Sequence, residues 1–199
     1  DYTLIMTTAK SIHTLDDMKG VKLRSSSRYA SKTLEALGGL PVQVPGPQIT
    51  ESMMRGVIDG GLLPWSAVRL LQLSDLAKHF TDFGDDQVKL SNAAQIFGMS
   101  QASYDKLPDD LKAIIDANSG IETAGMFGRA MDEVDKIGRA KAEASGNKII
   151  TLDPNETARW KAAADPIVAE WIVEMNGKGV DGAALVEDSR ALVAAEAGK

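Results

Sequence analysis

Residues 21–44 read VKLRSSSRYASKTLEALGGLPVQV, and residues 53–65 read MMRGVIDGGLLPW. These segments alternate short strand-like runs of apolar residues with helix-like runs that end in glycine. The order strand, helix, strand, helix, strand predicts an open α/β sheet with helices on its faces. Arg24 stands at the end of the first strand, and such sheets bind small molecules just beyond the carboxyl ends of their strands. Arg24 is therefore a candidate ligand anchor.

The pattern divides the chain into two parts. Residues 1–100 predict an α/β ligand-binding lobe, with a last strand over residues 88–99. Residues 101–199 predict a helix-rich region, because apolar residues recur at helical spacing from residue 108 to about residue 145 and again further on. A helix of that length is typical of one that crosses between two lobes. We expect a break near Gly120, since glycine costs about 1 kcal/mol in a helix interior.

The composition argues against several classes of function. A formal net charge of -6 disfavours nucleic acid, which proteins bind through basic patches. The chain has no cysteine and 2 histidines, so we expect no metal ion, no cofactor and no thiol nucleophile. It lacks the G-x-S-x-G and Walker A motifs, and the letters GKGVDG at residues 177–182 follow a helix instead of a strand. An enzyme is the least favoured class.

Arg24 and Trp65 each allow two interpretations. The guanidinium group of Arg24 presents a flat fork of donors that matches a carboxylate in two parallel bonds. It could bind a ligand in that way, or it could form a salt bridge with an acidic residue at the edge of the sheet. Trp65 follows Pro64 at the start of a helix, where its ring could belong to the core or form one wall of a pocket.

Several short motifs carry a family resemblance. The chain reads DMKGVKLR at residues 17–24, LGGLP at 37–41, GVIDG at 56–60, PW at 64–65 and YDKLPDDL at 104–111. In this order and spacing the motifs resemble the solute-binding receptors of tripartite ATP-independent periplasmic (TRAP) transporters. The resemblance covers nearly the whole chain.

The resemblance implies a function and a site. Receptors of this family have two α/β lobes, joined by crossing strands and a long helix, that close around a ligand in the periplasm. They are made with a signal peptide that is removed, and they deliver the ligand to membrane permease subunits. By this resemblance Arg24 grips the carboxylate of a small organic acid, and Leu62, Leu63 and Trp65 line the ligand pocket.

This chain departs from the family pattern in two respects. Many relatives carry Gln-Glu-Asn-Pro where residues 61–64 read GLLP, so the polar contact usual at Leu63 is replaced by an apolar one. The sequence of the N-terminal lobe is also missing, and we expect it to have been removed or to lie upstream. An alternative function is an effector-sensing α/β domain of a regulatory protein, with a similar pocket and no transporter.

Overall fold

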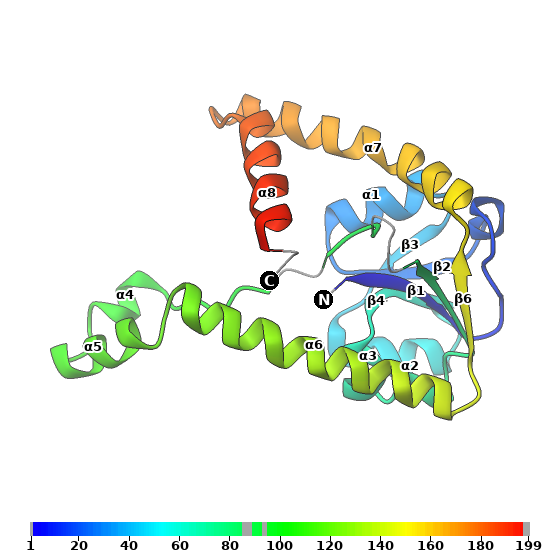
Figure 1. The fold of residues 1–199 in the computed structure, drawn as a ribbon, viewed down its shortest axis with the longest axis horizontal. Coiled ribbons are helices and arrows are strands. Elements are labelled where there is room, and N and C mark those ends of the chain that lie inside the picture. The colour runs from blue at the N-terminus through cyan, green and yellow to red at the C-terminus, as the bar shows by residue number, and fades with distance from the viewer. Residues whose placement is uncertain (1, 85–88, 93–94, 197–199) are drawn as a thin grey trace.

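The computed structural model describes residues 2–84, 89–92 and 95–196, and it contains one mixed sheet covered by helices on both faces (Figure 1). The strands are β1 (Thr3–Thr7), β2 (Lys22–Ser25), β3 (Leu40–Gln43), β4 (Gly60–Pro64), β5 (His79–Phe83) and β6 (Lys148–Leu152). The α-helices are α1 (Arg28–Ala36), α2 (Ile49–Met54), α3 (Ser66–Leu70), α4 (Gln101–Tyr104), α5 (Asp109–Ala117), α6 (Ile121–Ala144), α7 (Pro154–Gly177) and α8 (Gly182–Glu196). Short 3-10 turns are η1 (Leu15–Met18), η2 (Gly46–Gln48) and η3 (Leu73–Asp75).

The sheet has the strand order β3-β2-β4-β1-β5-β6. β1 runs antiparallel to both of its neighbours, whereas β2 is parallel to β3 and β4, and β5 is parallel to β6. All strands other than β1 therefore point the same way, and their carboxyl ends lie at one edge, together with the start of β1. This arrangement confirms the predicted α/β class with an open mixed sheet.

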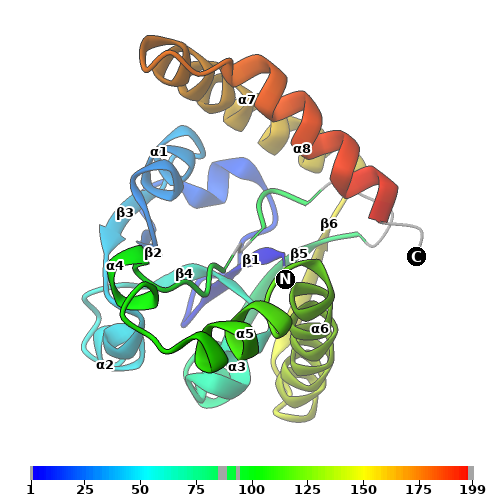
Figure 2. The ribbon, with the colours of Figure 1, turned by 90° about the vertical axis from the view of Figure 1, so that its left-hand side faces the viewer.

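Two apolar cores lie on the two faces of this sheet. Helices α1 and α7 cover one face, and α2, α3 and α6 cover the other (Figure 2). Successive strand residues point to opposite faces, so in β1 Leu4 and Met6 enter the core under α3 while Ile5 enters the core under α7. On the α7 side the ring of Trp160 meets Phe83 edge-on, with ring centroids 6.0 Å apart.

The helical region extends away from the sheet. α4, α5 and the first part of α6 project beyond the strands, and the second part of α6 packs along α3 (Figure 1). Gly120, with φ of +88°, separates α5 from α6, which confirms the predicted break. None of the described helices combines the length and apolar character that a membrane span needs.

The strand predicted over residues 88–99 does not form in the part that the structure describes. Residue 88 and residues 93–94 lie outside the described ranges, residues 95–100 have no regular structure, and Asn92 makes an isolated bridge to Tyr2. A strand needs a partner for its backbone groups, and Ile96 and Phe97 are instead almost fully exposed. The neighbouring strand β5 was not predicted, because its sequence HFTDF mixes polar and apolar residues without clear alternation.

Candidate functional site

Arg24 lies at the carboxyl edge of the sheet, between Val42 of β3 and Gly61 of β4. Its side chain is half-buried, and its Nε donates a hydrogen bond to the backbone oxygen of Val44 at 3.1 Å. Burial lowers the pKa of the Arg24 guanidinium below its ordinary value. Within the described ranges no carboxylate lies close enough to form an ion pair with Arg24. The salt bridge considered as an alternative is therefore absent from this part of the chain.

Gly61 leaves space beside Arg24. A Cβ atom at position 61 would lie 3.3 Å from the Cβ of Arg24 and 3.1 Å from the side chain of Leu63, both tighter than ordinary contacts. A larger residue at this position would press on Arg24 and Leu63 together. Glycine at position 61 thus leaves room for the Cβ of Arg24 and the side chain of Leu63.

Leu62 and Leu63 point to opposite faces of the sheet. Leu63 packs in the core with Val44 and Trp65, on the face toward which Arg24 also points. Leu62 packs in the other core with Leu23. The structure therefore places Arg24, Leu63 and Trp65 on the same face of the sheet and Leu62 on the opposite face.

Trp65 is a core residue with a polar contact. Its side chain is 2% exposed, and its ring stacks on that of Phe80 with centroids 5.2 Å apart. The indole Nε1 donates to the Tyr2 hydroxyl at 3.1 Å and to Asp82 Oδ2 at 3.3 Å.

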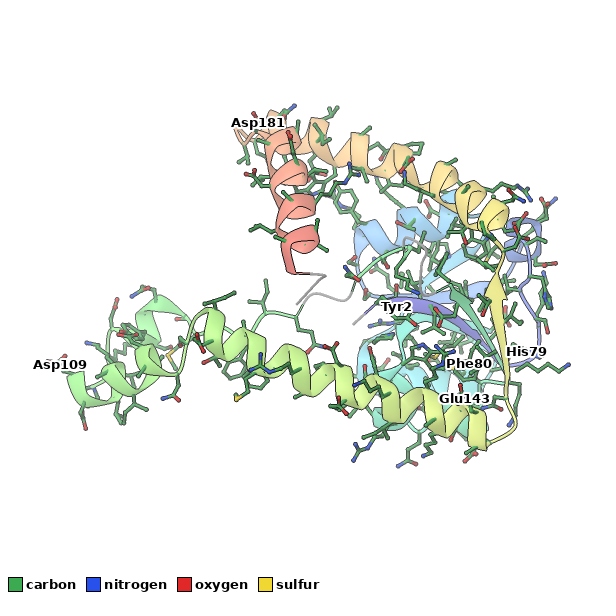
Figure 3. The ribbon with its side chains drawn as sticks, in the orientation of Figure 1. Tyr2, His79, Phe80, Asp109, Glu143 and Asp181 are labelled. Atoms are coloured by element: carbon green, nitrogen blue, oxygen red, sulfur yellow. The ribbon has the colours of Figure 1, made fainter. Side chains whose placement is uncertain are left out.

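Two residues around Trp65, Tyr2 and Phe80, lie at the sheet, whereas Asp109 and Asp181 lie at the far ends of the helical region (Figure 3).

A buried carboxylate, Asp82, was missed by sequence reasoning. Besides Trp65, its Oδ2 accepts the hydroxyl of Tyr2 at 2.8 Å and lies 3.8 Å from Nη1 of Arg139. Burial, followed by the bond to Asp82, raises the pKa of Tyr2 to about 12. The one available signal was an aspartate placed between two phenylalanines, Phe80 and Phe83, because buried acids are rare unless they are paired.

The remaining polar residues do not form a metal centre in the described part of the chain. No group of three or more histidine, cysteine, aspartate or glutamate side chains there could hold a metal ion. His79 accepts or donates one hydrogen bond with Ser11 at 2.8 Å. A cavity of about 180 Å³ opens between α7 and residues 89–90, but Arg24 does not line it.

Comparison with known proteins identifies the family. The model of the bacterial extracellular solute-binding protein family 7 matches residues 3–174. The chain belongs to this family. The TRAP receptor assignment predicted from the sequence is therefore confirmed, as is the periplasmic location that goes with it. Family 7 is a group of transport proteins and not a class of enzymes.

A curated relative in family 7 is the C4-dicarboxylate-binding periplasmic protein DctP of Rhodobacter capsulatus. It is 24% identical over 156 residues, which make up 76% of this chain and 44% of the relative. A solute-binding protein of Albidiferax ferrireducens is likewise 24% identical, over 75% of this chain and 43% of the relative. The chain thus spans less than half the length of these curated relatives.

Solved structures agree more closely with this chain. The TRAP solute-binding protein of Rhodoferax ferrireducens, in complex with copurified benzoate, is 36% identical with a TM-score of 0.91. A marine metagenome receptor specific for aromatic acids, in complex with 3-hydroxybenzoate, is 33% identical with a TM-score of 0.90. Each match covers 97% of this chain and 60% of the solved chain. These similarities favour a transport receptor over a regulatory domain.

Proposed function

We propose that this chain forms the carboxylate-gripping part of a non-enzymatic TRAP receptor. The receptor binds a small organic acid between the α/β lobe, in which β6 joins the strands of residues 1–100, and a second lobe, and it delivers the acid to membrane permease subunits. The single observation that carries the proposal is the half-buried guanidinium group of Arg24, which has no acidic partner within the described ranges.

The position of Arg24 supports a role as the ligand anchor. A half-buried guanidinium group has lost part of its hydration, and a carboxylate can replace it with two charge-assisted hydrogen bonds. The bond from Nε to Val44 orients the side chain, and among the described residues no hydrogen bond occupies the two terminal Nη groups, so both can bind a ligand. The carboxyl ends of the parallel strands, where open α/β sheets bind ligands, meet at this edge.

We further propose that the ligand is an aromatic monocarboxylate. Relatives at 36% and 33% identity were solved with benzoate and 3-hydroxybenzoate. Leu63 stands where many relatives carry an asparagine, so the ligand body meets an apolar surface there. Leu63 and Trp65, both nearly buried, would form the floor of the pocket, and Leu62 would support this floor from the opposite face.

Exposed apolar side chains support the presence of a second lobe. Large apolar residues are rarely left exposed in a cluster unless another surface covers them. In this chain one group of them lies on α5, on the first part of α6 and on the segment before α4, all away from the sheet. The residues are Ile96, Phe97, Met99, Leu111, Ile114, Ile121, Met126 and Phe127.

The test uses the protein expressed from its complete coding sequence, titrated calorimetrically with benzoate, 3-hydroxybenzoate and succinate. We expect the aromatic acids to bind more tightly than succinate, because Leu63 offers no polar partner to a second carboxylate. Arg24→Ala should weaken benzoate binding by a factor of about 10² to 10⁴, the equivalent of two charge-assisted hydrogen bonds.

Arg69→Ala is the matched control. Arg69 is an exposed arginine in the last turn of α3, so its removal changes the net charge equally without touching the sheet edge. Its affinity for benzoate should equal that of the unmodified protein. Unchanged affinity in Arg24→Ala would remove the anchor role, and tighter binding of succinate than of benzoate would reject the aromatic class.

A further inference from the structure

Helix α6 packs against the turn that connects β4 to α3, which we call the corner. This corner, residues 63–66, carries Leu63 and Trp65 of the proposed pocket. Gly138 of α6 packs directly on it, since a Cβ atom at position 138 would lie 2.0 Å from the backbone oxygen of Trp65. The two backbones can approach this closely only because residue 138 has no side chain.

Asp135, one turn earlier on α6, supplies a cap that the local sequence lacks. The N-cap residue of α3 is Trp65, whose side chain has no oxygen to accept a backbone N–H. The Ser66 N–H instead donates to Asp135 Oδ1 at 2.6 Å, across 69 positions of sequence. Burial raises the pKa of the Asp135 carboxyl, while the bond from Ser66 opposes that change.

Arg139 adds a third contact to the same corner. The central carbon of its guanidinium group lies 5.8 Å from the centroid of the Trp65 ring. The Trp65 ring therefore contacts a cation in addition to the Phe80 ring on which it stacks. Its Nη1 lies 3.8 Å from Asp82 Oδ2, the acceptor for the Trp65 indole. The orientation of the Trp65 ring therefore depends on a residue of α6.

We propose that Asp135, supported by Gly138 and Arg139, is a positioning residue for ligand binding in this receptor. It fixes the start of α3, and through it the positions of Leu63 and Trp65 beneath the ligand. α6 also reaches the exposed apolar surface assigned above to the second lobe, so the helix links the ligand floor to that lobe. This inference rests on the proposed function.

The experiment compares three variants of the full-length protein. Asp135→Ala removes the cap, Asp135→Asn retains an oxygen that can accept the Ser66 N–H, and Asp153→Ala removes a cap of the same kind from α7, far from the corner. Hydrogen exchange of residues 63–70 reports on the corner without ligand, and calorimetry with benzoate reports on affinity.

We expect faster exchange of residues 63–70 in Asp135→Ala and a dissociation constant for benzoate raised about three- to thirtyfold, the equivalent of one lost cap. Asp135→Asn should restore most of the affinity. Asp153→Ala should match Asp135→Ala in thermal stability while it binds benzoate normally. If Asp135→Ala does not fold, Arg139→Met, which keeps an apolar stem over Trp65, provides the test, with an expected rise of about threefold.

Three outcomes would overturn the inference. The first is unchanged benzoate affinity in a folded Asp135→Ala or Arg139→Met variant. The second is an equal loss of affinity in Asp153→Ala, which would mark a general stability effect. The third is faster exchange at the corner without loss of affinity. In each case, normal binding by the unmodified protein together with weak binding by Arg24→Ala would still support the proposed function. If the unmodified protein bound no carboxylate, both the proposed function and this inference would be overturned.

Discussion

Tyr2 and Asp82 stand 80 positions apart in the chain, and the Tyr2 hydroxyl donates to Asp82 Oδ2 at 2.8 Å. The bond joins the start of β1 to the end of β5. The Trp65 indole shares the same oxygen, so one buried carboxylate connects β1, β4 and β5 at the edge where the proposed ligand binds.

The first prediction concerns Asp82. Asp82→Ala leaves the Tyr2 hydroxyl without its acceptor and the Trp65 indole with the Tyr2 hydroxyl alone, and we expect the free energy of unfolding to fall by about 2–4 kcal/mol. Asp82→Asn keeps one oxygen acceptor and should cost about half as much. Urea unfolding measures both. Equal stability of the alanine variant and the unmodified protein would contradict the view that Asp82 holds this edge together.

The second prediction concerns the titration of Tyr2, whose pKa is raised to about 12 from 10.0. The folded protein holds the phenol proton more tightly than the unfolded chain. The resulting stabilisation is fully present below pH 10.0 and is lost as the pH rises through about 12. A phenolate absorbance titration should show one tyrosine ionising near pH 12, and Tyr2→Phe should remove that step. A step near pH 12 that persists in Tyr2→Phe would assign it to another tyrosine.

The third prediction compares two glycines. A Cβ atom at Gly60 would lie 1.8 Å from the backbone oxygen of Met6, so Gly60→Ala must force β4 away from β1. We expect it to cost about 2–4 kcal/mol of the free energy of unfolding. Gly128 lies inside α6 with open space around it, and Gly128→Ala should stabilise the protein by about 0.5–1 kcal/mol. Thermal unfolding of both variants checks the opposite signs.

The fourth prediction concerns Thr157 on α7. Its hydroxyl is buried, and within the described ranges it has no hydrogen-bond partner. Thr157→Val should therefore be neutral or stabilise the protein by up to about 1 kcal/mol, since it removes an unpaired polar group from the core. Thr81→Val is the control, because the buried Thr81 hydroxyl donates to the Ile12 oxygen at 2.7 Å and its loss should cost about 1–2 kcal/mol. Equal losses in both variants would show that Thr157 has a partner.

The local features of the fold could be predicted from the sequence. The β2–α1–β3 unit follows from hydrophobic periodicity, with Ser27 capping the helix through a bond from the Ala30 N–H. The break at Gly120 follows from the conformational freedom of glycine, and the α7 start follows from Asp153 before Pro154. Each of these depends on residues within about four positions of one another, so each is visible in a short window of sequence.

The strand β5 and the contacts of Asp82 could not be predicted in this way. HFTDF is a strand because β1 lies on one side and β6 on the other, although both are far from it in the sequence. The strand predicted over residues 88–99 shows the converse, since in the described segments these residues form one isolated bridge, from Asn92 to Tyr2, and no continuous pairing with a neighbouring strand. Backbone pairing partners are a tertiary property.

The sequence by itself indicated the α/β class and the family, and through the family resemblance it predicted Arg24 as the carboxylate partner. The tertiary structure alone decided that Leu63 and Trp65 share a face with Arg24, that Leu62 does not, and that Asp135 caps α3 from 69 positions away. The physical reason is the distance along the chain over which each kind of interaction acts. Periodicity and capping act within one or two turns, whereas burial and long-range hydrogen bonds arise only when the sheet and α6 pack together.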